Sequence, residues 1–373
     1  MKAQRPLGLA LSWPRLLAVF LADVGILALV SNWPEVWRRD IAWWTGVGIA
    51  VVVAIAALLT YRGVPVGKLI GSWMGNFFTK AEPKLAARLT PTVDHRHRYG
   101  HTMVGVREYR GELVAAIAVG APVESSAGRH SQSEVVTAEL PVQAIAAGLR
   151  QFDVRLDALD IISIGTAGAA GDRPPGAWLV LRMDPQRNVD AVTVRDSLAS
   201  TLAAATERVA EDLGRRRFDA WPLNAAELAD LDTTVQAGLR PDETAVRLRF
   251  LKQVVGKECY GYVTSFWVSP KDLETDTLKK LWAPDVDATV LTVRLTPHHN
   301  QVEVSAWVRY HSVGRLTKET WRGLNRLAGR QLAAVLTSLP VPTRQTLLRL
   351  PARALQESDS LTVPLRTSDR VGQ

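Results

Sequence analysis

Two long apolar runs occupy most of the first sixty residues of the chain. Leu16–Val30 carries one charged residue, Asp23, and its flanks extend the run to Trp13–Trp33, while Ile41–Tyr61 carries no charge. A helix needs about 20 apolar residues to span a bilayer, so each run predicts a transmembrane helix. The short linker Ser31–Asp40 predicts that the two helices form a hairpin. A cleaved signal peptide with the first run as its apolar core is the alternative interpretation.

The basic residues around this hairpin predict its orientation. They lie before and after it, whereas the two arginines of the linker are matched by two acidic residues. Cytoplasmic flanks of membrane helices are enriched in Lys and Arg, so both termini are expected in the cytoplasm and the chain in the inner membrane. The flanking residues are Lys2, Arg5, Arg15, Arg62, Lys68, Lys80, Lys84 and Arg88.

Two further features near the N-terminus predict helix contacts. A carboxylate at mid-span is costly in lipid, so Asp23 is expected to face protein. It would act as a helix–helix contact or a proton-relay group, or it would be protonated and hydrogen-bonded within the hairpin or to a partner helix. Gly63, Gly67, Gly71 and Gly75 recur every four residues after the second run. On a helix such a row lets a partner helix approach closely. A glycine-loosened linker is the alternative interpretation of the row.

From Pro91 onward the pattern becomes that of a globular domain. Alternation of apolar and polar residues predicts two hairpins, Val104–Tyr109 with Glu112–Val119 and Leu291–Leu295 with Val302–Tyr310. Strands and helices mix without regular βαβ units and without a recognisable repeat, which favours an α+β fold with a mixed sheet. The other predicted strands are Asp160–Ile164, Trp178–Arg182 and Tyr260–Val268, and the predicted helices are Pro141–Phe152, Asn188 or Asp190 to Leu213, Asn224–Leu239, Pro270–Trp282 and Lys318–Leu339.

The sequence therefore divides into five segments. They are a cytosolic N-terminal tail (1–12), a transmembrane helical hairpin (13–61), a juxtamembrane segment (62–90), a cytosolic α+β domain (91–340) and an extended C-terminal tail (341–373).

The last predicted helix carries a regular row of cations. Lys318, Arg322, Arg326 and Arg330 are spaced four residues apart, on the side opposite its apolar stripe. Like charges at this spacing repel each other by a few tenths of a kcal/mol unless counter-charges lie nearby. The row therefore predicts contact with an acidic partner surface or with lipid headgroups, and simple solvent exposure is the alternative.

Composition narrows the class of protein. Cys259 is the single cysteine, which excludes an internal disulfide and a four-cysteine zinc site. The net charge is +8, but residues 1–93 hold ten Lys and Arg against four Asp and Glu. The positive charge thus belongs mainly to the region of the predicted hairpin, and nucleic acid is not expected as a partner.

No catalytic motif is found in the chain. It lacks HExxH, GxSxG and phosphate-loop patterns, and His95, His97 and His101 lie near one acidic residue, too few groups to predict a metal site. The pair Asp285 and Asp287 is the best remaining candidate, because carboxylate oxygens suit the divalent ion of a nucleotide-sugar enzyme. We therefore expect no catalytic residues, metal or cofactor, with a membrane-bound glycosyltransferase using this pair as the alternative.

Several segments resemble the EccE component of the mycobacterial type VII (ESX) secretion machinery, most closely the paralogue of the fifth such system. They include GLALSWPRLLAVFLADVGILAL, VGVREYRGELVAAI, LRQFDVRLDALDIISIG, WLVLRMDPQRNVDAVTVRDSLASTLAAATERV, YVTSFWVSP, SAWVRYHS and GLNRLAGRQLAAV. The resemblance runs from the first apolar run nearly to the tail. It implies two membrane spans, a cytosolic domain distantly like a glycosyltransferase without established activity, and assembly with EccB, EccC and EccD subunits.

Pattern and resemblance together predict a structural inner-membrane subunit of a protein-export complex. In this interpretation the hairpin fixes the chain in the bilayer, the glycine row packs on partner helices, and the globular domain supports neighbouring subunits. A freestanding membrane-bound sensor is a further alternative.

Overall fold

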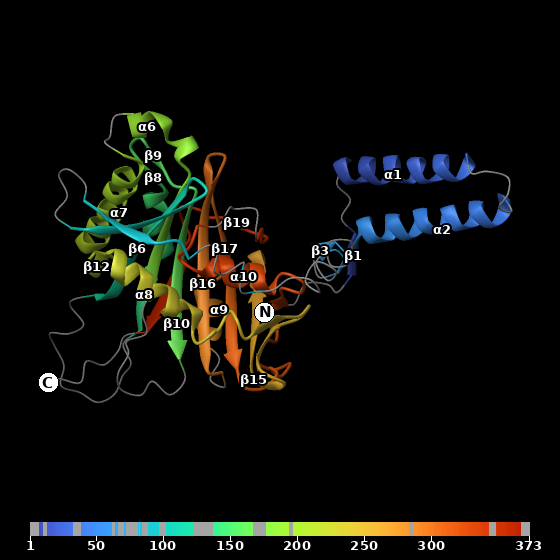
Figure 1. Ribbon diagram of the computed structural model, residues 1–373. Helices are drawn as coiled ribbons and strands as arrows, with labels where there is room; N and C mark the ends of the chain where they lie inside the picture. The colour runs from blue at the N-terminus through green and yellow to red at the C-terminus, as the bar shows by residue number, and fades with distance from the viewer. Residues whose placement is uncertain are drawn as a thin grey trace. The chain divides into compact units, whose positions relative to one another are not determined.

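The computed structural model shows a chain of two compact units, Lys2–Thr79 and Lys80–Gln373 (Figure 1). The two units are described separately. The residues that the structure describes are 7–9, 13–32, 39–61, 64–65, 71, 81, 83, 89–96, 102–122, 137–166, 177–193, 197–282, 286–342 and 348–366.

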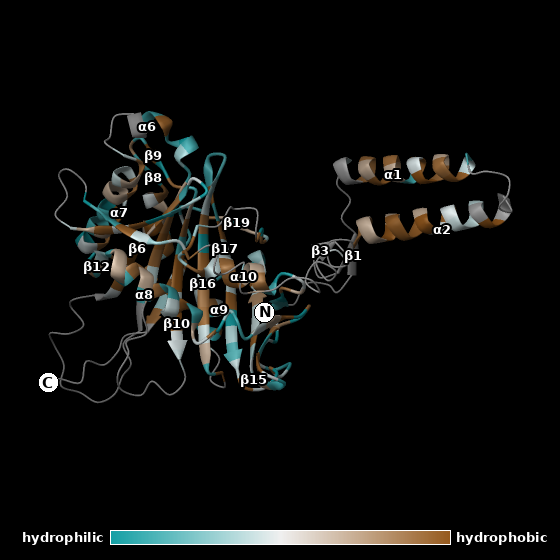
Figure 2. Ribbon diagram, in the orientation of Figure 1, coloured by the Kyte–Doolittle hydropathy of each residue, from teal (hydrophilic) through white to brown (hydrophobic). Residues whose placement is uncertain are grey.

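The N-terminal unit contains a pair of helices. They are α1 (Trp13–Ser31) and α2 (Arg39–Leu58). A small antiparallel sheet consists of β1 (Leu7–Leu9), which precedes α1, and of β2 (Leu59–Tyr61) and β3 (Val64–Pro65), which follow α2. Both helices are predominantly hydrophobic along their length (Figure 2). Within the described part of the chain, the structure contains no helix with both the length and the apolar character that crossing a membrane requires. The two predicted helices are therefore found, and their crossing of a membrane is not confirmed.

The two helices pack along a regular seam. Half-buried residues of α1 recur every three or four positions, at Leu16, Val19, Asp23, Ile26 and Val30, and Leu27 is half-buried beside this row. Gly46 of α2 is buried, and a Cβ atom added there would lie 2.6 Å from a methyl carbon of Val30. Glycine at this position therefore lets α1 and α2 approach closely.

The second unit is built around one large antiparallel sheet, which contains thirteen strands among the described residues. Its continuous order is β13-β14-β15-β17-β16-β10-β11-β6-β5-β4. In addition, β12 pairs with β6, β18 with β15 and β19 with β17. The strands are β4 (Thr92–His95), β5 (Val104–Tyr109), β6 (Glu112–Pro122), β10 (Ala158–Thr166), β11 (Ala177–Met183), β12 (Phe218–Pro222), β13 (Thr244–Val246), β14 (Leu251–Val255), β15 (Glu258–Trp267), β16 (Ala288–His298), β17 (Gln301–Ser312), β18 (Asn325–Arg326) and β19 (Arg353–Ala354).

Shorter elements complete this unit. Two small sheets pair β7 (Thr137–Pro141) with β20 (Thr362–Arg366) and β8 (Arg150–Gln151) with β9 (Val154–Arg155). The helices are α5 (Val142–Ala146), α6 (Val189–Thr193), α7 (Leu198–Arg215), α8 (Ala225–Gln236), α9 (Thr275–Lys280) and α10 (Gln331–Ser338). The predicted α+β class is confirmed for this unit, and the paired strands of its sheet are antiparallel rather than mixed.

The large sheet contains a repeat of strand order. In the first half, two hairpins, β5–β6 and β10–β11, pair as β5-β6-β11-β10. In the second half, the hairpins β14–β15 and β16–β17 pair in the same way, as β14-β15-β17-β16. The halves join where β10 pairs with β16. This repeat lies in the pairing of strands and not in the residues, so it is compatible with the absence of a recognisable repeat in the sequence.

Helices cover both faces of the sheet. Successive residues of a strand point to opposite faces, and Ile161 and Ile162 of β10 accordingly belong to different cores. The core that contains Ile161 also contains buried residues of α5, α7 and α9, and the core that contains Ile162 contains those of α8 and α10. We call these the α7 face and the α10 face.

Both predicted hairpins are confirmed. Arg110 and Gly111 form the turn of the first with positive φ angles of 52° and 78°, as a tight hairpin turn requires. The second hairpin turns at His299 and Asn300, between the paired residues His298 and Gln301. The helix predicted from Asn224 is also confirmed, because Asn224 caps α8 in a capping box with Glu227.

Two predicted helices are shorter than expected. The long helix to Leu213 is interrupted: α7 begins at its own cap, Ser197, whose side chain accepts from the N–H of Ser200. Asn188 does not cap it, because its amide side chain pairs with the backbone of Arg155. The helix predicted from Pro141 to Phe152 ends after α5 and one 3₁₀ turn, and β8 follows.

The prediction of a helix over Lys318–Leu339 was wrong for its first half. Residues 318–330 form turns and β18, and α10 covers Gln331–Ser338 only. Gly323 and Gly329 have φ angles of 83° and 74°, which lie in the left-handed region and break a helix. In the C-terminal segment, β19 pairs with β17 and β20 pairs with β7.

Candidate functional site

A cluster of buried charges lies on the α10 face of the sheet. Asp160 of β10 is opposite Arg294 of β16 in the strand register, and Arg182 comes from the neighbouring β11. Arg294 Nε and Nη2 donate to the two carboxylate oxygens of Asp160 at 2.6 and 2.7 Å, and Arg182 Nε donates at 2.8 Å. All three side chains are buried, so these ion pairs are shielded from water.

The remaining donors of these arginines bind the end of α10. In the last turn of α10, the carbonyl oxygen of Thr337 accepts from Arg182 Nη2 and from Arg294 Nη2, each at 3.4 Å. Arg182 Nη2 also donates to the carbonyl oxygen of the C-cap residue Leu339 at 2.8 Å, and its Nη1 donates to that of Val341, beyond the helix. The last carbonyl groups of a helix lack partners within the helix and carry its negative dipole end. Buried guanidinium groups satisfy both requirements, and they thereby fix α10 on the sheet.

Two further arginines extend this cluster to α8. Arg107 of β5 forms a two-pronged pair with Asp232 of α8, at 2.8 and 2.5 Å. Arg309 of β17 donates to Ser338 Oγ at 2.9 Å and to the carbonyl oxygen of Val235 near the end of α8. We call the whole set the arginine layer: Arg107, Asp160, Arg182, Asp232, Arg294 and Arg309.

The balance between burial and neighbouring charge, and with it the direction of the pKa shift, differs among the residues of the arginine layer. Burial opposes ionisation of Asp160, but Arg294 and Arg182 outweigh it and hold the pKa of Asp160 below its usual value. Burial raises the pKa of Asp232 against the opposing effect of Arg107. Arg309 has no carboxylate partner among the described residues, and burial lowers its pKa to about 9. Burial and the charge of Arg309 together lower the pKa of His311 well below its usual value.

This chemistry suits structural support. Guanidinium groups are poor acids and bases, and those of the layer are committed to carboxylates and helix ends. The sequence carried a signal that we did not use, namely charged residues within otherwise apolar strands. Asp160 begins the predicted strand Asp160–Ile164, and Arg182 ends Trp178–Arg182. Such residues are rarely buried unless paired, so they could have been matched to each other.

The four predicted cations of the last helix do not form a row, because no helix holds them. Arg326 lies in β18 with its guanidinium carbon 5.4 Å from the ring centre of Phe266 and 4.7 Å from that of Trp321. Arg330 precedes α10 and donates to the carbonyl oxygen of Arg349 at 3.0 Å, and burial lowers its pKa. Their contact with a partner or with headgroups stays a prediction.

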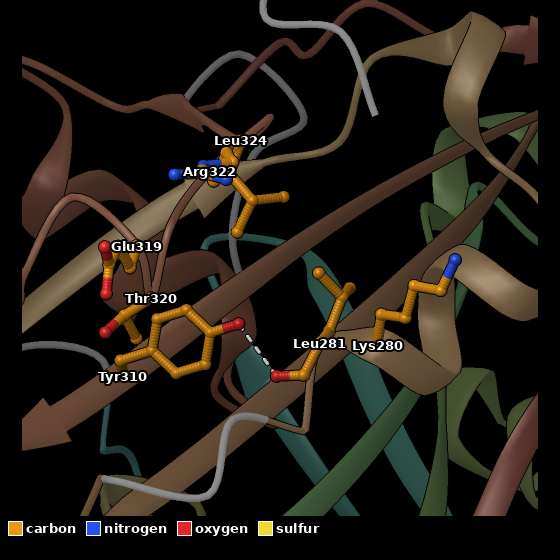
Figure 3. Close-up of a pocket in the computed structure, with 7 residues that line it drawn as sticks. All are labelled: Lys280, Leu281, Tyr310, Glu319, Thr320, Arg322 and Leu324. Atoms are coloured by element: carbon orange, nitrogen blue, oxygen red, sulfur yellow. Dashed lines mark hydrogen bonds between the residues drawn. The ribbon is translucent and has the colours of Figure 1, made fainter.

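Arg322 instead lines a pocket of about 260 Å³ on the α7 face of the second half (Figure 3). The side chain of Tyr310 lies in the pocket, and its hydroxyl donates to the carbonyl oxygen of Leu281 at 2.7 Å. The lining residues are Lys280, Leu281, Tyr310, Glu319, Thr320, Arg322 and Leu324. The pocket has charged groups of both signs, positive from Lys280 and Arg322 and negative from Glu319.

The remaining predicted site residues are partly outside the described residues. Gly63, Gly67, Gly75, His97, His101 and Asp285 lie there. Gly71 is helical, with nothing within 4 Å of a Cβ added to it. Asp287 is exposed, and its backbone N–H donates to the carbonyl oxygen of His311. Within the described part of the chain, no three His, Cys, Asp or Glu residues lie together in a way that could hold a metal ion.

Asp23 lies in the seam of the α1–α2 hairpin. It is half-buried, and its Oδ1 atom is buried without a hydrogen-bond partner among the described residues. The corresponding seam of α2 contains Gly46, Ala50 and Val53, none of which has a polar side chain. Its predicted role as a protein contact is not tested by these observations.

Comparisons with known proteins identify a matching family model and several relatives of this chain. Residues 174–268 match the family model EccE, described as "Putative type VII ESX secretion system translocon, EccE". The "ESX-5 secretion system protein EccE5" of Mycobacterium tuberculosis H37Rv is 46% identical over 411 aligned residues that cover 100% of both chains. The protein of the same name from Mycobacterium marinum is 45% identical over 394 residues, covering 98% of this chain and 96% of the relative. The "ESX-1 secretion system protein EccE1" is 25% identical over 79% of this chain.

These relatives define the class of the protein, a component of a type VII ESX secretion system. Within that class, the chain belongs to the EccE family. The resemblance found from the sequence alone is thereby confirmed, including its closeness to the fifth ESX system.

Proposed function

We propose that the chain is a structural inner-membrane subunit of a type VII secretion complex, anchored by the α1–α2 hairpin with both termini in the cytoplasm. The exposure of apolar side chains on this hairpin carries the proposal. Leu17, Phe20, Leu29 and Val52 are between 52% and 71% exposed. Removing apolar surface from water is favourable by roughly 25 cal/mol per Å². A bilayer provides that environment for both helices at once, and the uncharged run Ile41–Tyr61 is of spanning length.

The proposed partners are the EccB, EccC and EccD subunits of the same complex, together with membrane lipids. The glycine row Gly63, Gly67, Gly71 and Gly75 would pack against partner helices, and Asp23 would stabilise helix packing within the membrane. Lys318 and Arg322 would contact an acidic partner or headgroups. The large sheet and the arginine layer give the cytosolic domain a rigid body, which suits a supporting role.

Topology is the direct test of the anchor. Cys259 is the only cysteine, so Cys259→Ser provides a background for single cysteines placed at Asn32 in the linker and at Glu357 in the domain. We expect a membrane-impermeant maleimide to label Asn32→Cys in intact cells and Glu357→Cys only in inverted vesicles. Labelling of Glu357→Cys in intact cells, or release of the chain by carbonate, would contradict the proposal.

Assembly tests the proposed partner contacts. Gly67→Leu with Gly71→Leu should reduce the amount of chain in the large complex extracted by mild detergent, because leucine side chains would keep a partner helix at a distance. Ser72→Leu, next to the row, is the matched control and should assemble normally. If the Gly67→Leu, Gly71→Leu variant and the Ser72→Leu variant enter the large complex in equal amounts, the proposed contact of the glycine row with a partner helix is wrong.

We propose no catalytic role for the domain. Saturable, Mn²⁺-dependent binding of a nucleotide sugar by the purified full chain, lost in Asp287→Ala, would overturn this part and favour the glycosyltransferase alternative.

A further inference from the structure

The β8–β9 hairpin presents an aromatic side chain at its tip. Phe152 is the first residue of the two-residue turn between Gln151 and Val154, and it is 90% exposed. Its φ angle of 51° lies in the left-handed region, which glycine and asparagine adopt at lower cost. Exposing the ring to water and holding a non-glycine residue at this φ angle are both unfavourable for the chain by itself.

The hairpin is firmly held at its base. Gln151 Nε2 donates to the carbonyl oxygen of Gly148 at 3.1 Å and to that of Ala205, in α7, at 3.2 Å. Leu149 and Val154 are buried in the core of the α7 face. The position of Phe152 is therefore fixed before any binding, which reduces the entropy lost when a partner binds.

Cations border the exposed ring. Arg150 and Arg155 are directly opposite each other across β8 and β9, and both are exposed. Neither forms an ion pair among the described residues, and like charges placed opposite in a hairpin are unfavourable. The guanidinium carbon of Arg208 lies 5.7 Å from the ring centre of Phe152. Asp153 contributes one negative charge to the turn, so the tip keeps a net positive charge.

We propose that this tip, Arg150–Arg155, is a docking surface for another protein subunit, which receives Phe152 in an apolar pocket and places a carboxylate between Arg150 and Arg155. The inference rests on the proposed role in a multi-subunit complex. A fixed aromatic side chain with flanking arginines has the composition of an interface hot spot. A lipid surface fits less well, because segments that bind membranes insert several apolar residues, and this turn offers one.

The test uses the full chain in its native membranes. A photo-crosslinking amino acid replaces Phe152, and the crosslinked partner and peptide are identified by mass spectrometry. We expect one protein partner whose crosslinked peptide contains Asp or Glu, and we expect the crosslink to disappear in Arg150→Glu with Arg155→Glu. Lys257→Glu, a reversal of an exposed charge elsewhere, is the control and should preserve it. Crosslinks to lipid alone, or none, would overturn the inference.

A second variant separates docking from folding. Phe152→Asn removes the ring and suits the positive φ, so the midpoint of unfolding should stay unchanged or rise. Affinity for the crosslinked partner should fall about thirtyfold, the loss expected of a hot spot. Val313→Asn, which also alters an exposed apolar residue, should leave affinity unchanged. Unchanged affinity of Phe152→Asn would contradict the inference.

The two proposals fail in different ways. If Phe152 has no partner while the chain still migrates in a large complex, only the docking surface is wrong. If the wild-type chain migrates alone after mild extraction, the proposed function itself is wrong.

Discussion

The two halves of the large sheet share one strand order and differ in how their α7 face is covered. In the first half, the face is covered by α7, a helix of 18 residues whose Leu202, Val209 and Leu213 are buried. In the second half, α9 has 6 residues, and turns at residues 318–323 lie where the start of the helix Lys318–Leu339 was predicted. The pocket beside Tyr310 lies in this second half. Strand pairing therefore does not determine how completely a sheet face is closed.

On the opposite face the two halves are tied together. Asp160 and Arg182 belong to the first half, and Arg294 and Arg309 belong to the second. The ion pair of Asp160 with Arg294 crosses the β10–β16 junction, whereas its pair with Arg182 lies within the first half. The halves thus differ on the α7 face and share one set of charges on the α10 face.

Removing Asp160 should have the largest effect, because it breaks the tie between the halves. Asp160→Ala would leave buried Arg294 without a carboxylate among the described residues and would leave Arg182 with that of Glu112 alone, 3.9 Å from its Nη1 atom. Breaking a buried ion pair in this way typically costs about 3–5 kcal/mol of unfolding free energy. Urea denaturation of the purified full chain in mild detergent measures this loss. Glu357→Gln, at an exposed carboxylate, should change stability by less than about 0.5 kcal/mol. A loss below about 1 kcal/mol for Asp160→Ala would mean that the junction does not depend on this pair.

The contribution of Asp160 should also depend on pH. Its pKa in the folded chain is lower than its ordinary value near 4, so its ionised form stabilises the fold above that pH. This stabilisation should be lost as the pH falls from about 4 through the folded pKa. The difference in unfolding free energy between wild type and Asp160→Asn, measured from pH 7 to 3, should be constant above about pH 5 and narrow below 4. A difference that is independent of pH would contradict the ion pairs.

Gly105→Ala should weaken the first half selectively. A Cβ atom there would lie 2.5 Å from the backbone carbon of Asn224, the residue that begins α8. Overpacking of this kind costs about 1–3 kcal/mol of unfolding free energy. Gly314→Ala is the matched control in the second half, since nothing lies within 4 Å of its Cβ. Equal stability of the two variants in urea denaturation would show that α8 can move away from β5.

Tyr310→Phe should have the smallest effect, confined to the second half. It removes the hydrogen bond to the carbonyl oxygen of Leu281 and leaves that oxygen without the hydroxyl, at a cost of about 1 kcal/mol. Differential scanning calorimetry should show a small fall in the unfolding temperature. Tyr109→Phe, at a half-buried side chain whose hydroxyl forms no hydrogen bond among the described residues, is the control and should change it less. An equal or larger fall for Tyr109→Phe would contradict the structural role of the Tyr310 hydroxyl.

Local patterns predicted elements well where one residue fixed the backbone. Arg110-Gly111 predicted a turn, because glycine adopts the positive φ angle that the turn needs. Asn224 with Glu227 predicted a helix start, because these side chains accept hydrogen bonds from the free backbone N–H groups of the first turn. The prediction of a helix over residues 318–330 was wrong, because apolar residues spaced three or four apart can also belong to turns that cover a sheet. The candidate site could be predicted only in part. The charged residues of the arginine layer can be read from the sequence, but their pairing cannot, because partners such as Asp160 and Arg294 lie far apart along the chain.

The sequence by itself determined the two apolar runs, the hairpins, the start of α8 at Asn224 and the family, since these depend on composition and short-range patterns. Only the tertiary structure decided the order of strands, the repeat of two halves, and the pairing of Asp160 with two arginines. Those features depend on which distant segments bury each other. The free energy of a buried charge is set by the neighbours that the fold brings to it, and no local pattern specifies them.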